Sequence, residues 1–353
     1  MQNADRQWGR ALIGAVNRVL GLAREHGVAK HINLVLALYQ SYATSLGMYG
    51  SQVWSTRYLH ADRIFHSAVQ KSHLGMLRYL VKARQGTASW PLLSELGQKP
   101  FQYYWWRSAL AFWNIIVDSN SPLLEAVVKS DVALSLAGCA QCWCSEVVDA
   151  MRSYSATDDG SVAQAVHDMH HLKQVDCTAV LCEVQKGFAD FWQQSEGVGD
   201  ARRGDVLNRK VVNFATHFKA SGVFAPIPEY LRCDGIPYHN RIRAARFRLG
   251  SHNLEVERGR YNSTPWVLRS CRRCDEVFLD TLDCQVDDEY HMLFECEAFR
   301  HLRSAEIQAL LDQSNGSIRT FVETGDISVV HNFISDCMKL VDDLVVLEPP
   351  SAG

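Results

Sequence analysis

Apolar residues recur every three or four positions over most of the chain, the spacing that predicts amphipathic helices. In the first segment, Leu12, Ala15, Val16, Val19 and Leu22 share one face of the expected helix, and polar residues occupy the rest. Further helices are predicted over residues 31–45, 58–82, 101–118, 131–152, 160–194, 206–220 and 329–346. Alternating polar and apolar runs, which indicate strands, are scarce. The pattern predicts a mainly α fold.

Glycine and proline clusters predict where these helices end. Breaks are expected at residues 86–90, 119–122, 197–204 and 226–237. Ser89, Pro91 and Gly97 predict one short helix, with serine at the N-cap, proline in the first turn and glycine at the stop. The cluster near residue 200 marks a domain boundary. We therefore expect a helical domain over 1–200 and a second domain over 201–353.

The composition is that of a globular protein, with 47% hydrophobic and 21% charged residues among 353. It excludes wholesale disorder, and the net charge of -3 excludes a uniformly basic nucleic-acid binder. No apolar run reaches the roughly 18 to 20 residues of a membrane span, and residues 1–10 lack the apolar core of a signal peptide. These features predict an intracellular protein, in the nucleus or cytoplasm, with no membrane partner.

Charge is segregated along the chain. Residues 1–110 contain 13 basic and 4 acidic residues, whereas residues 111–200 contain 4 and 13. Residues 201–275 contain 15 and 6, and residues 276–353 contain 4 and 16. Basic blocks of this kind fit contact with a phosphate backbone, or they pair with the acidic blocks beside them. Charge alone leaves both interpretations open.

A cysteine and histidine pattern predicts a metal site. Cys271 and Cys274 form a C-x2-C pair, and His291 and Cys296 follow as H-x4-C. Three thiolates and an imidazole suit a tetrahedral zinc ion, and four protein ligands leave no position for an activated water. The expected zinc is therefore structural. Cys284 could replace one ligand, and free buried thiols are the alternative explanation.

The second ligand pair imposes a local geometry. Asp287 is placed to cap a helix that runs through Tyr290 and His291. Residues five apart are about 140° apart on an ideal α-helix, so His291 and Cys296 would point in different directions. We therefore expect the helix to open before Cys296.

A cluster of arginines lies upstream of the first ligand pair and between its two cysteines. We expect the segment from Arg241 to Arg248 to form a basic helix with two arginine rows beside an apolar stripe. Phosphate contact is the functional interpretation, and salt bridges to the acidic segment after Glu276 are the alternative. The candidate nucleic-acid contacts are Arg241, Arg243, Arg246, Arg248, Arg258, Arg260, Arg272 and Arg273.

The segments RFRLGSHNLEVERGRYN, CRRC and DDEYHMLFECEAFRHLR together resemble the zinc-binding C-terminal region of reverse transcriptases from non-LTR (LINE-type) retrotransposons. That family has an R-x-G-x-H-x-L-x-x-E-x-GR stretch before its metal ligands. The positions that match it and the acidic and H-x4-C cluster after it are Arg248, Gly250, His252, Leu254, Glu257, Gly259, Arg260, Asp287, Asp288, Glu289, His291 and Cys296.

The N-terminal part resembles the same family. SLGMYGSQVW, at residues 45–54, is similar to the YGSEVW segment that follows the polymerase palm, and LLSELGQKPFQYYWWRSALAFWN resembles the ELGRxP stretch of the thumb and connection. The resemblance implies a thumb/connection-like domain followed by a zinc knuckle. Independently of it, the aromatic residues here are expected to form a core: Tyr49, Trp54, Trp105, Trp106, Phe112 and Trp113.

Several catalytic signatures are missing from the sequence. The family's palm uses paired aspartates to hold two metal ions, whereas residues 188–191 read FADF, and Asp190 lies in a helical pattern. The sequence contains neither a Gly-rich phosphate loop nor a G-x-S-x-G elbow, so no small-molecule substrate is expected. His167, His170 and His171 fit a solvated helix face, and Cys139, Cys142 and Cys144 fit packing. No catalysis is expected from this chain.

The resemblance therefore implies a C-terminal fragment of a reverse transcriptase that binds RNA or DNA and has the catalytic part of such an enzyme as a further partner. A zinc-stapled helical adaptor for other proteins is the alternative from another class. An inert remnant of a degraded element is a third.

Overall fold

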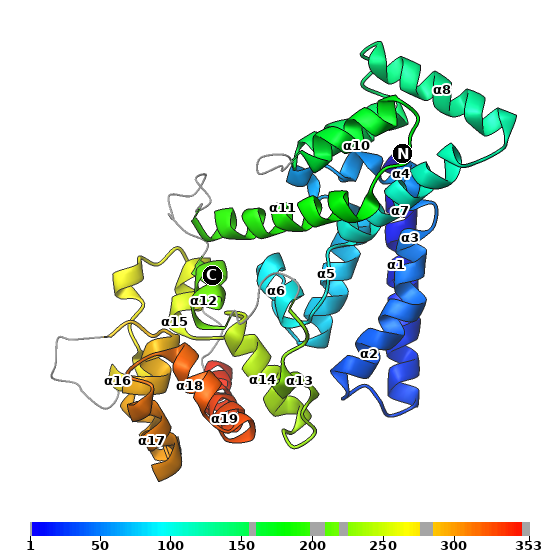
Figure 1. Cartoon of the computed structure of the whole chain (residues 1–353). Coiled ribbons are helices and arrows are strands. Elements are labelled where there is room, and N and C mark those ends of the chain that lie inside the picture. Colours follow the sequence, from blue (N-terminus) through cyan, green and yellow to red (C-terminus); the bar gives the residue numbers. More distant parts are fainter. Residues whose placement is uncertain (1, 155–159, 198–208, 219–224, 276–284, 348–353) are drawn as a thin grey trace. The chain divides into compact units, whose positions relative to one another are not determined.

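The computed structural model describes the chain except residues 1, 155–159, 198–208, 219–224, 276–284 and 348–353 (Figure 1). Helices dominate the described residues, and no strand occurs among them. Their only isolated β-bridge joins Ser270 to Val286. The expectation of a mainly α fold is confirmed.

The chain divides into two compact units, each described here by itself. Unit 1 comprises residues 1–29, 33–77 and 98–195, and unit 2 comprises residues 30–32, 78–97 and 196–353. Residues 78–97 thus belong with the C-terminal unit, although the division by sequence assigned them to the first domain. The reason lies in buried contacts, because Glu95 pairs with Arg248 inside unit 2. The metal-ligand segment also lies in unit 2.

Unit 1 is a helical assembly around buried tryptophans. Its helices are α1 (Gln2–Glu25), α2 (Ile32–Leu38), α3 (Thr44–Met48), α4 (Ser51–Trp54), α5 (Ala68–Leu80), α7 (Phe101–Val117), α8 (Pro122–Leu136), α9 (Trp143–Arg152), α10 (Ser161–His170) and α11 (Cys177–Gly197). On α7, the indole of Trp105 donates to the Gly47 carbonyl at 3.0 Å and that of Trp113 to the Lys173 carbonyl at 2.9 Å. Burying each indole with a hydrogen-bond partner avoids the cost of an unpaired donor.

The expected aromatic core is largely correct. Trp54, Trp105, Trp106 and Trp113 are buried, and Phe112 is half-buried. The prediction that Tyr49 belongs to this core is wrong, because its side chain is 67% exposed. Tyr49 has extended backbone angles directly after the end of α3, and Gly50, with a φ of +62°, follows it before α4.

The predicted helices agree with the structure in position but several are interrupted. The segment 131–152 divides at Gly138, which has a φ of +83°. Asp131 then caps α9, because its carboxylate accepts hydrogen bonds from the Trp143 and Cys144 amides at 3.2 and 2.7 Å. The segment 160–194 divides after α10, and Asp176 accepts from the first amides of α11. Carboxylates that satisfy free helix amides make these restarts favourable.

Three local expectations need correction. Leu22 is 46% exposed and Ala23 takes its place on the buried face of α1, because a period of 3.6 residues brings Ala23 back in line with Leu12 after about three turns. The segment 58–82 contains 3-10 turns, η2 (Thr56–Tyr58) and η3 (Ala61–Arg63), before α5. Ala88, and not Ser89, is the N-cap of the short helix α6 (Ser89–Glu95), which begins at Ser89. The helix ends before Gly97, as expected.

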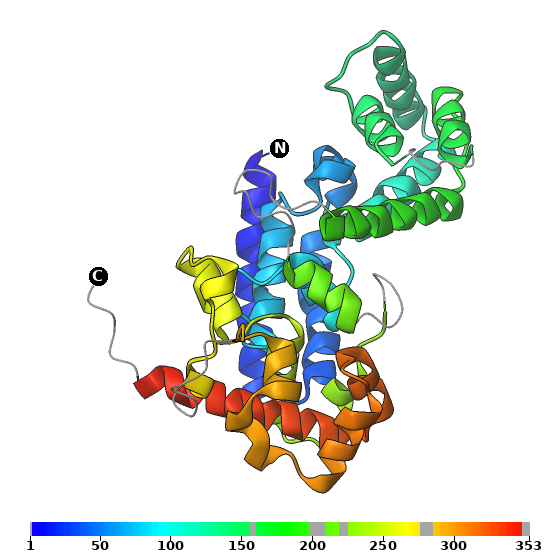
Figure 2. The ribbon, with the colours of Figure 1, turned by 90° about the vertical axis from the view of Figure 1, so that its left-hand side faces the viewer.

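Unit 2 is built around two packed helices, α14 (Tyr238–Arg248) and α19 (Ile327–Leu347). Figure 2 shows α19, in red, as the long helix of this unit. The other helices of unit 2 are α6, α12 (Arg209–His217), α13 (Glu229–Arg232), α15 (Glu255–Tyr261), α16 (Arg272–Asp275), α17 (Ala305–Gln313) and α18 (Ile318–Thr324), with the shorter η5 (Trp266–Leu268), η6 (His291–Glu295) and η7 (Glu297–Leu302).

Candidate metal centre

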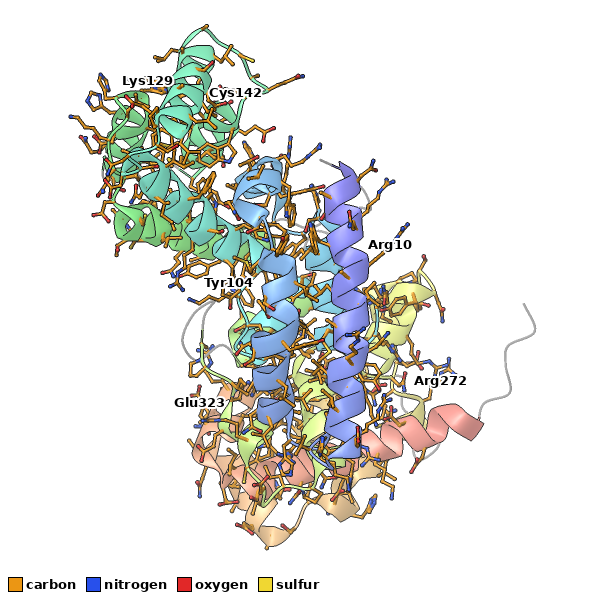
Figure 3. All side chains as sticks on the ribbon, turned by 90° about the vertical axis from the view of Figure 1, so that its right-hand side faces the viewer. Arg10, Tyr104, Lys129, Cys142, Arg272 and Glu323 are labelled. Atoms are coloured by element: carbon orange, nitrogen blue, oxygen red, sulfur yellow. The ribbon has the colours of Figure 1, made fainter. Side chains whose placement is uncertain are left out.

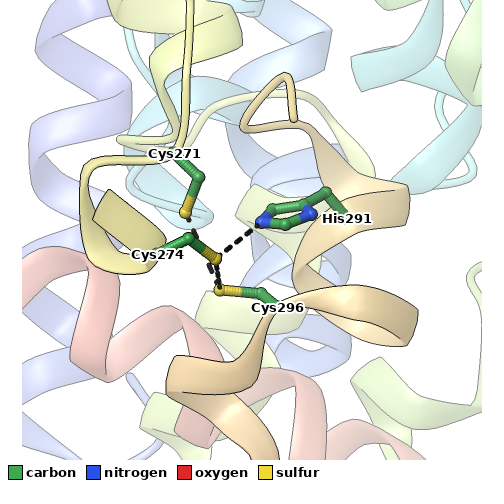
Figure 4. A group of neighbouring side chains, drawn as sticks. All are labelled: Cys271, Cys274, His291 and Cys296. Carbon is green, nitrogen blue, oxygen red and sulfur yellow. Dashed lines mark hydrogen bonds between the residues drawn. The ribbon is translucent and has the colours of Figure 1, made fainter. Parts of the chain in front are cut away.

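Four side chains converge on one point of unit 2 (Figure 4). The sulfur of Cys274 lies 3.3 Å from Nε2 of His291 and 3.4 Å from the sulfur of Cys296. The sulfurs of Cys271 and Cys296 are 3.7 Å apart, and all four donor atoms lie within 4.8 Å of one another. A tetrahedral ion with metal–sulfur bonds of about 2.3 Å needs sulfurs about 3.8 Å apart. The donor atoms therefore stand close to the corners of such a tetrahedron.

The first ligand pair is held by a short turn. The bridge between Ser270 and Val286 places Cys271 beside the returning chain, where its amide donates to the Gln285 carbonyl at 3.1 Å. The Cys274 amide then donates to the Cys271 carbonyl at 3.1 Å. This turn brings the two thiols to the same side, as the C-x2-C spacing predicts.

The second pair is brought together by a π-helical turn. Within η6 the Cys296 amide donates to the His291 carbonyl at 2.8 Å, an i to i+5 hydrogen bond. Such a turn is wider than an α-helical turn, so residues five apart come close to the same side. Cys296 itself has extended backbone angles. The expectation that the α-helix opens before Cys296 is confirmed, and the wide turn is the form that the opening takes.

The expected cap of this turn is wrong by one residue. Oδ1 of Asp288, and not Asp287, accepts from the His291 amide at 2.9 Å. Asp287 is almost fully buried and accepts from the Glu255 amide at 2.8 Å, at the start of α15. The guanidinium of Arg273 pairs with the same carboxylate. Asp287 therefore joins the metal-ligand segment to α15 and to the turn between the two cysteines.

The imidazole of His291 is oriented by its second nitrogen. Nδ1 lies 2.6 Å from Oε1 of Gln285 and 3.4 Å from Oε2 of Glu295. These oxygens accept a hydrogen bond from Nδ1–H, which leaves the lone pair of Nε2 free on the side of the Cys274 sulfur. A partner of this kind fixes both the tautomer and the ring orientation of a metal-binding histidine. The sequence did not predict this role of Gln285, because the spacing of the metal ligands says nothing about which residue between the two pairs contacts the imidazole.

The thiols of the cluster influence one another. A hydrogen bond to Cys296, followed by burial, raises the pKa of Cys271 well above its usual value. The same hydrogen bond lowers the pKa of Cys296, because it stabilises the thiolate. One sulfur is thus prepared to lose its proton first, and metal binding requires that loss.

The donor set defines what the centre can do. Three sulfurs and one imidazole fill a tetrahedral coordination sphere, which leaves no site for a substrate or an activated water. Among the described residues, no other group of cysteine, histidine and carboxylate donors comes together in this way. His167, His170 and His171 lie at the end of α10 and after it, and Cys284 lies outside the described residues.

The predicted arginine contacts fall into two groups, and the first is buried. Arg248 forms a two-point ion pair with Glu95 at 2.7 and 3.1 Å. Arg241 donates to the Leu231 and Lys30 carbonyls at 3.1 and 3.2 Å. Arg246 pairs with Asp342 at 2.9 Å, and Arg243 is half-buried. The helix α14 therefore does not present two exposed arginine rows, because most of its surface packs inside unit 2.

The second group lies nearer the surface. The side chain of Arg272 is 62% exposed and extends outward (Figure 3), that of Arg260 is 34% exposed and that of Arg258 is 24% exposed. Glu255 pairs with Arg258 and Arg272 at 3.1 and 3.5 Å. Arg273 is largely covered. The arginines of this second group therefore form salt bridges and are also partly exposed to solvent.

The residues that carry the resemblance hold unit 2 together. His252 is fully buried, and its Nε2 lies 2.9 Å from Oε1 of Glu289. Glu257 pairs with the buried Lys210 at 2.9 Å. Gly259 leaves room for the Arg269 side chain, which a Cβ atom would approach to 2.7 Å. The partners Glu95, Glu289 and Lys210 come from distant segments, and nothing in the local sequence pairs them.

No family model, curated protein or solved structure matches this chain. Among the described residues, no helix combines the length and the apolar character that crossing a membrane requires. Asp190 of the FADF sequence lies inside α11.

Proposed function

We propose that Cys271, Cys274, His291 and Cys296 hold one structural zinc ion. The S3N donor set is typical of zinc, and softer or redox-active ions favour other ligand numbers or geometries. The distances of 3.3 to 3.7 Å between donor atoms are those of a tetrahedral site. When bound, the ion would tie the Cys271 turn to η6. Such sites contribute folding free energy directly.

The chain as a whole is proposed to be the C-terminal thumb, connection and zinc-binding region of a non-LTR retrotransposon reverse transcriptase. It would bind RNA or DNA in the nucleus or cytoplasm and would work with the catalytic part of such an enzyme, without catalysis of its own. The convergence of the four predicted ligands, directly after a stretch that matches the family's arginine-rich motif, is the observation that supports this proposal.

The partly exposed arginines are the proposed phosphate contacts. Arg258, Arg260 and Arg272 can reach a phosphate backbone from the surface of unit 2. Arg241 and Arg248 are buried and contact protein groups, so they would stabilise unit 2 without touching nucleic acid. Each phosphate that an arginine neutralises should steepen the dependence of log affinity on log salt by roughly 0.9 on duplex DNA.

Zinc content and nucleic-acid binding test both parts of the proposal. Elemental mass spectrometry should find one zinc per chain, and none in the Cys271→Ser, Cys274→Ser double variant. The wild type should bind labelled RNA or duplex DNA with an affinity that falls as salt rises. Arg272→Gln should reduce the salt slope while the zinc content stays the same. Absence of zinc would refute the metal site, and absence of binding at every salt concentration would refute the nucleic-acid role.

A second candidate is an adaptor for other proteins. The helix α8 in unit 1 exposes Leu123, Val127, Leu134 and Leu136, with exposed fractions from 48% to 73%. Exposed apolar side chains in such a group are typical of a protein contact. Capture of a protein partner by the chain, without any shift of RNA or DNA, would favour this function.

A further inference from the structure

A surface of exposed aromatic and apolar side chains follows α15 in unit 2. Tyr261 is 52% exposed, and η5 exposes Trp266, Val267 and Leu268 at 37%, 75% and 65%. We call Tyr261 and residues 266–268 the aromatic platform. Exposed tryptophan is costly in water, and no other tryptophan among the described residues reaches this exposure. The platform therefore needs a functional explanation.

The platform is held in place by an arginine beneath it. Nε of Arg269 donates to the Thr264 carbonyl and NH1 to the Val256 carbonyl, both at 2.9 Å. The Thr264 amide donates to the Gly259 carbonyl at 2.8 Å. These bonds fasten the loop onto α15, so the platform is presented on a fixed support and its ordering cost is met before any ligand binds.

Guanidinium groups lie against the platform rings. Arg260 and Arg84 stand over the ring of Tyr261, at 5.0 and 5.9 Å from its centroid. Arg269 stands 5.6 Å from the ring centroid of Trp266. Arginines interleaved with aromatic faces combine attraction for phosphates with surfaces on which bases stack.

Basic side chains cluster beside the platform and share two carboxylates. Glu255 pairs with both Arg258 and Arg272, and Glu257 pairs with both Arg260 and the buried Lys210. Among the described residues, each of these two carboxylates is shared by two cations, and Arg84 and Arg269 lie against the platform rings. An anionic ligand with flat apolar rings complements this combination, whereas a purely apolar partner would gain nothing from the arginines.

We infer that the aromatic platform binds single-stranded nucleic acid, with unpaired bases stacked on Trp266 and Tyr261 and phosphates on Arg258, Arg260 and Arg272. A duplex hides its base faces and offers only phosphates to these residues, so the stacking contacts select single strands. This inference deepens the proposed nucleic-acid binding and rests on it, because it names the form of nucleic acid that the surface takes.

The test compares a 12-nucleotide oligo(dT) or oligo(U) with a blunt DNA duplex, using the full chain. Trp266→Ala should weaken single-strand binding about 5- to 150-fold, the equivalent of about 1 to 3 kcal/mol per stacked base, and leave duplex binding within about twofold. Trp266→Phe should recover most of the affinity, because it keeps a stacking face. The salt slope should not change, since no charge is removed.

Matched variants and outcomes separate this inference from the proposed function. Leu38→Ala removes an apolar side chain of unit 1 with a similar exposed fraction, 41% against 37% for Trp266, and should change neither affinity. Zinc content and circular dichroism show that each variant is folded. An equal loss for both nucleic acids, or no loss, in Trp266→Ala would overturn the stacking inference and leave the proposed function standing. A wild type that binds duplex but no single strand would do the same. A wild type that binds neither would overturn both and point to a protein partner.

Discussion

Arg248 illustrates how a single residue can change its interpretation once its surroundings are known. Its guanidinium lies between the rings of Phe218 and Tyr230, at 4.7 and 5.2 Å from their centroids, and pairs with Glu95. Burial alone lowers the pKa of Arg248, but Glu95 and Tyr230 outweigh that effect and the pKa lies above its usual value. A cation this well enclosed serves stability and not nucleic-acid contact.

Breaking this ion pair should destabilise unit 2 strongly. Glu95→Gln leaves a buried guanidinium without its counter-charge, so the free energy of unfolding should fall by about 3 to 5 kcal/mol. The double variant Glu95→Leu, Arg248→Met should recover much of the loss, because it removes both charges. Urea unfolding followed by circular dichroism measures the change.

An exposed pair provides the control. Arg300→Gln breaks the ion pair with Glu297 on the surface and should cost about 1 kcal/mol or less. A cost of similar size for Glu95→Gln would show that the buried pair contributes no more than a surface pair.

His331 should make unit 2 sensitive to acid. Its ring is buried and stacks on Tyr230 with centroids 4.3 Å apart. Burial, and secondarily the charge of Arg248, lowers its pKa from 6.5 to about 4. The folded state favours the neutral ring, so this stability is complete above pH 6.5 and is lost as the pH falls from 6.5 to 4. The contribution amounts to at most about 3 kcal/mol.

Replacing His331 should flatten that dependence. The His331→Gln variant loses the titrating ring, so its free energy of unfolding should decline less between pH 7 and pH 4.5 than that of the wild type. Comparing the two slopes removes the contributions of other groups, among them buried His73, which lies in unit 1. Equal slopes would contradict the assignment.

At the scale of elements, short polar contacts decide where helices begin and how they connect. Asp131 and Asp176 restart helices that the apolar pattern ran together. Asp287 performs this role for α15 from a position more than thirty residues further along the chain. The spacing of apolar residues cannot predict such caps, because a cap depends on one polar side chain and on the amides that lie near it in three dimensions.

Removing the Asp287 cap should loosen α15 and the metal-ligand segment together. In Asp287→Ala, loss of the cap should lower the free energy of unfolding by about 1 to 2 kcal/mol. The variant also leaves the largely buried Arg273 without the carboxylate it pairs with. We expect a total loss of roughly 3 kcal/mol or more, with faster hydrogen exchange at the amides of Glu255 and Val256. Hydrogen exchange with mass spectrometry measures both.

The matched control removes a carboxylate that caps nothing. Asp312 is exposed on α17 and its side chain accepts from Gln308. Asp312→Ala should therefore change the stability by about 0.5 kcal/mol or less. If Asp287→Ala behaved in the same way, the coupling between α15 and the metal-ligand segment would be disproved.

At the scale of the whole molecule, the metal centre belongs to one unit. The four ligands lie in unit 2, near α15 and η7, whereas unit 1 has its own tryptophan core. Metal binding that contributes folding free energy should therefore act on unit 2 first.

Chelation tests this division. A strong zinc chelator should accelerate hydrogen exchange in α15, η6 and η7 by a factor of 10 or more, while α7 keeps its protection. Adding zinc in excess should restore the slow exchange. Unchanged exchange in η6 would show that the cluster contributes no stability, and equal acceleration in α7 would show that the two units unfold as one.

The sequence predicted the local features of this protein well. The helical class, the tryptophan core of α7 and the four residues of the candidate metal site all follow from spacing, because helix periodicity and the knuckle between paired cysteines are local properties. The opening of the helix before Cys296 could be predicted for the same reason. Zinc, nucleic-acid binding and the retrotransposon family remain proposals that these features support.

Only the tertiary structure decided which charges are buried. Arg248 and Arg272 look alike in the sequence, yet one is enclosed by Glu95 and two aromatic rings and the other extends into solvent. Glu95 lies 153 positions from Arg248, and His252 finds Glu289 across 37 positions. Pairings of this kind depend on how distant segments pack, and burial and pKa follow from the packing. The sequence therefore determined the helical class and the convergence of the candidate metal site, whereas the fold determined which side chains remain available to a partner.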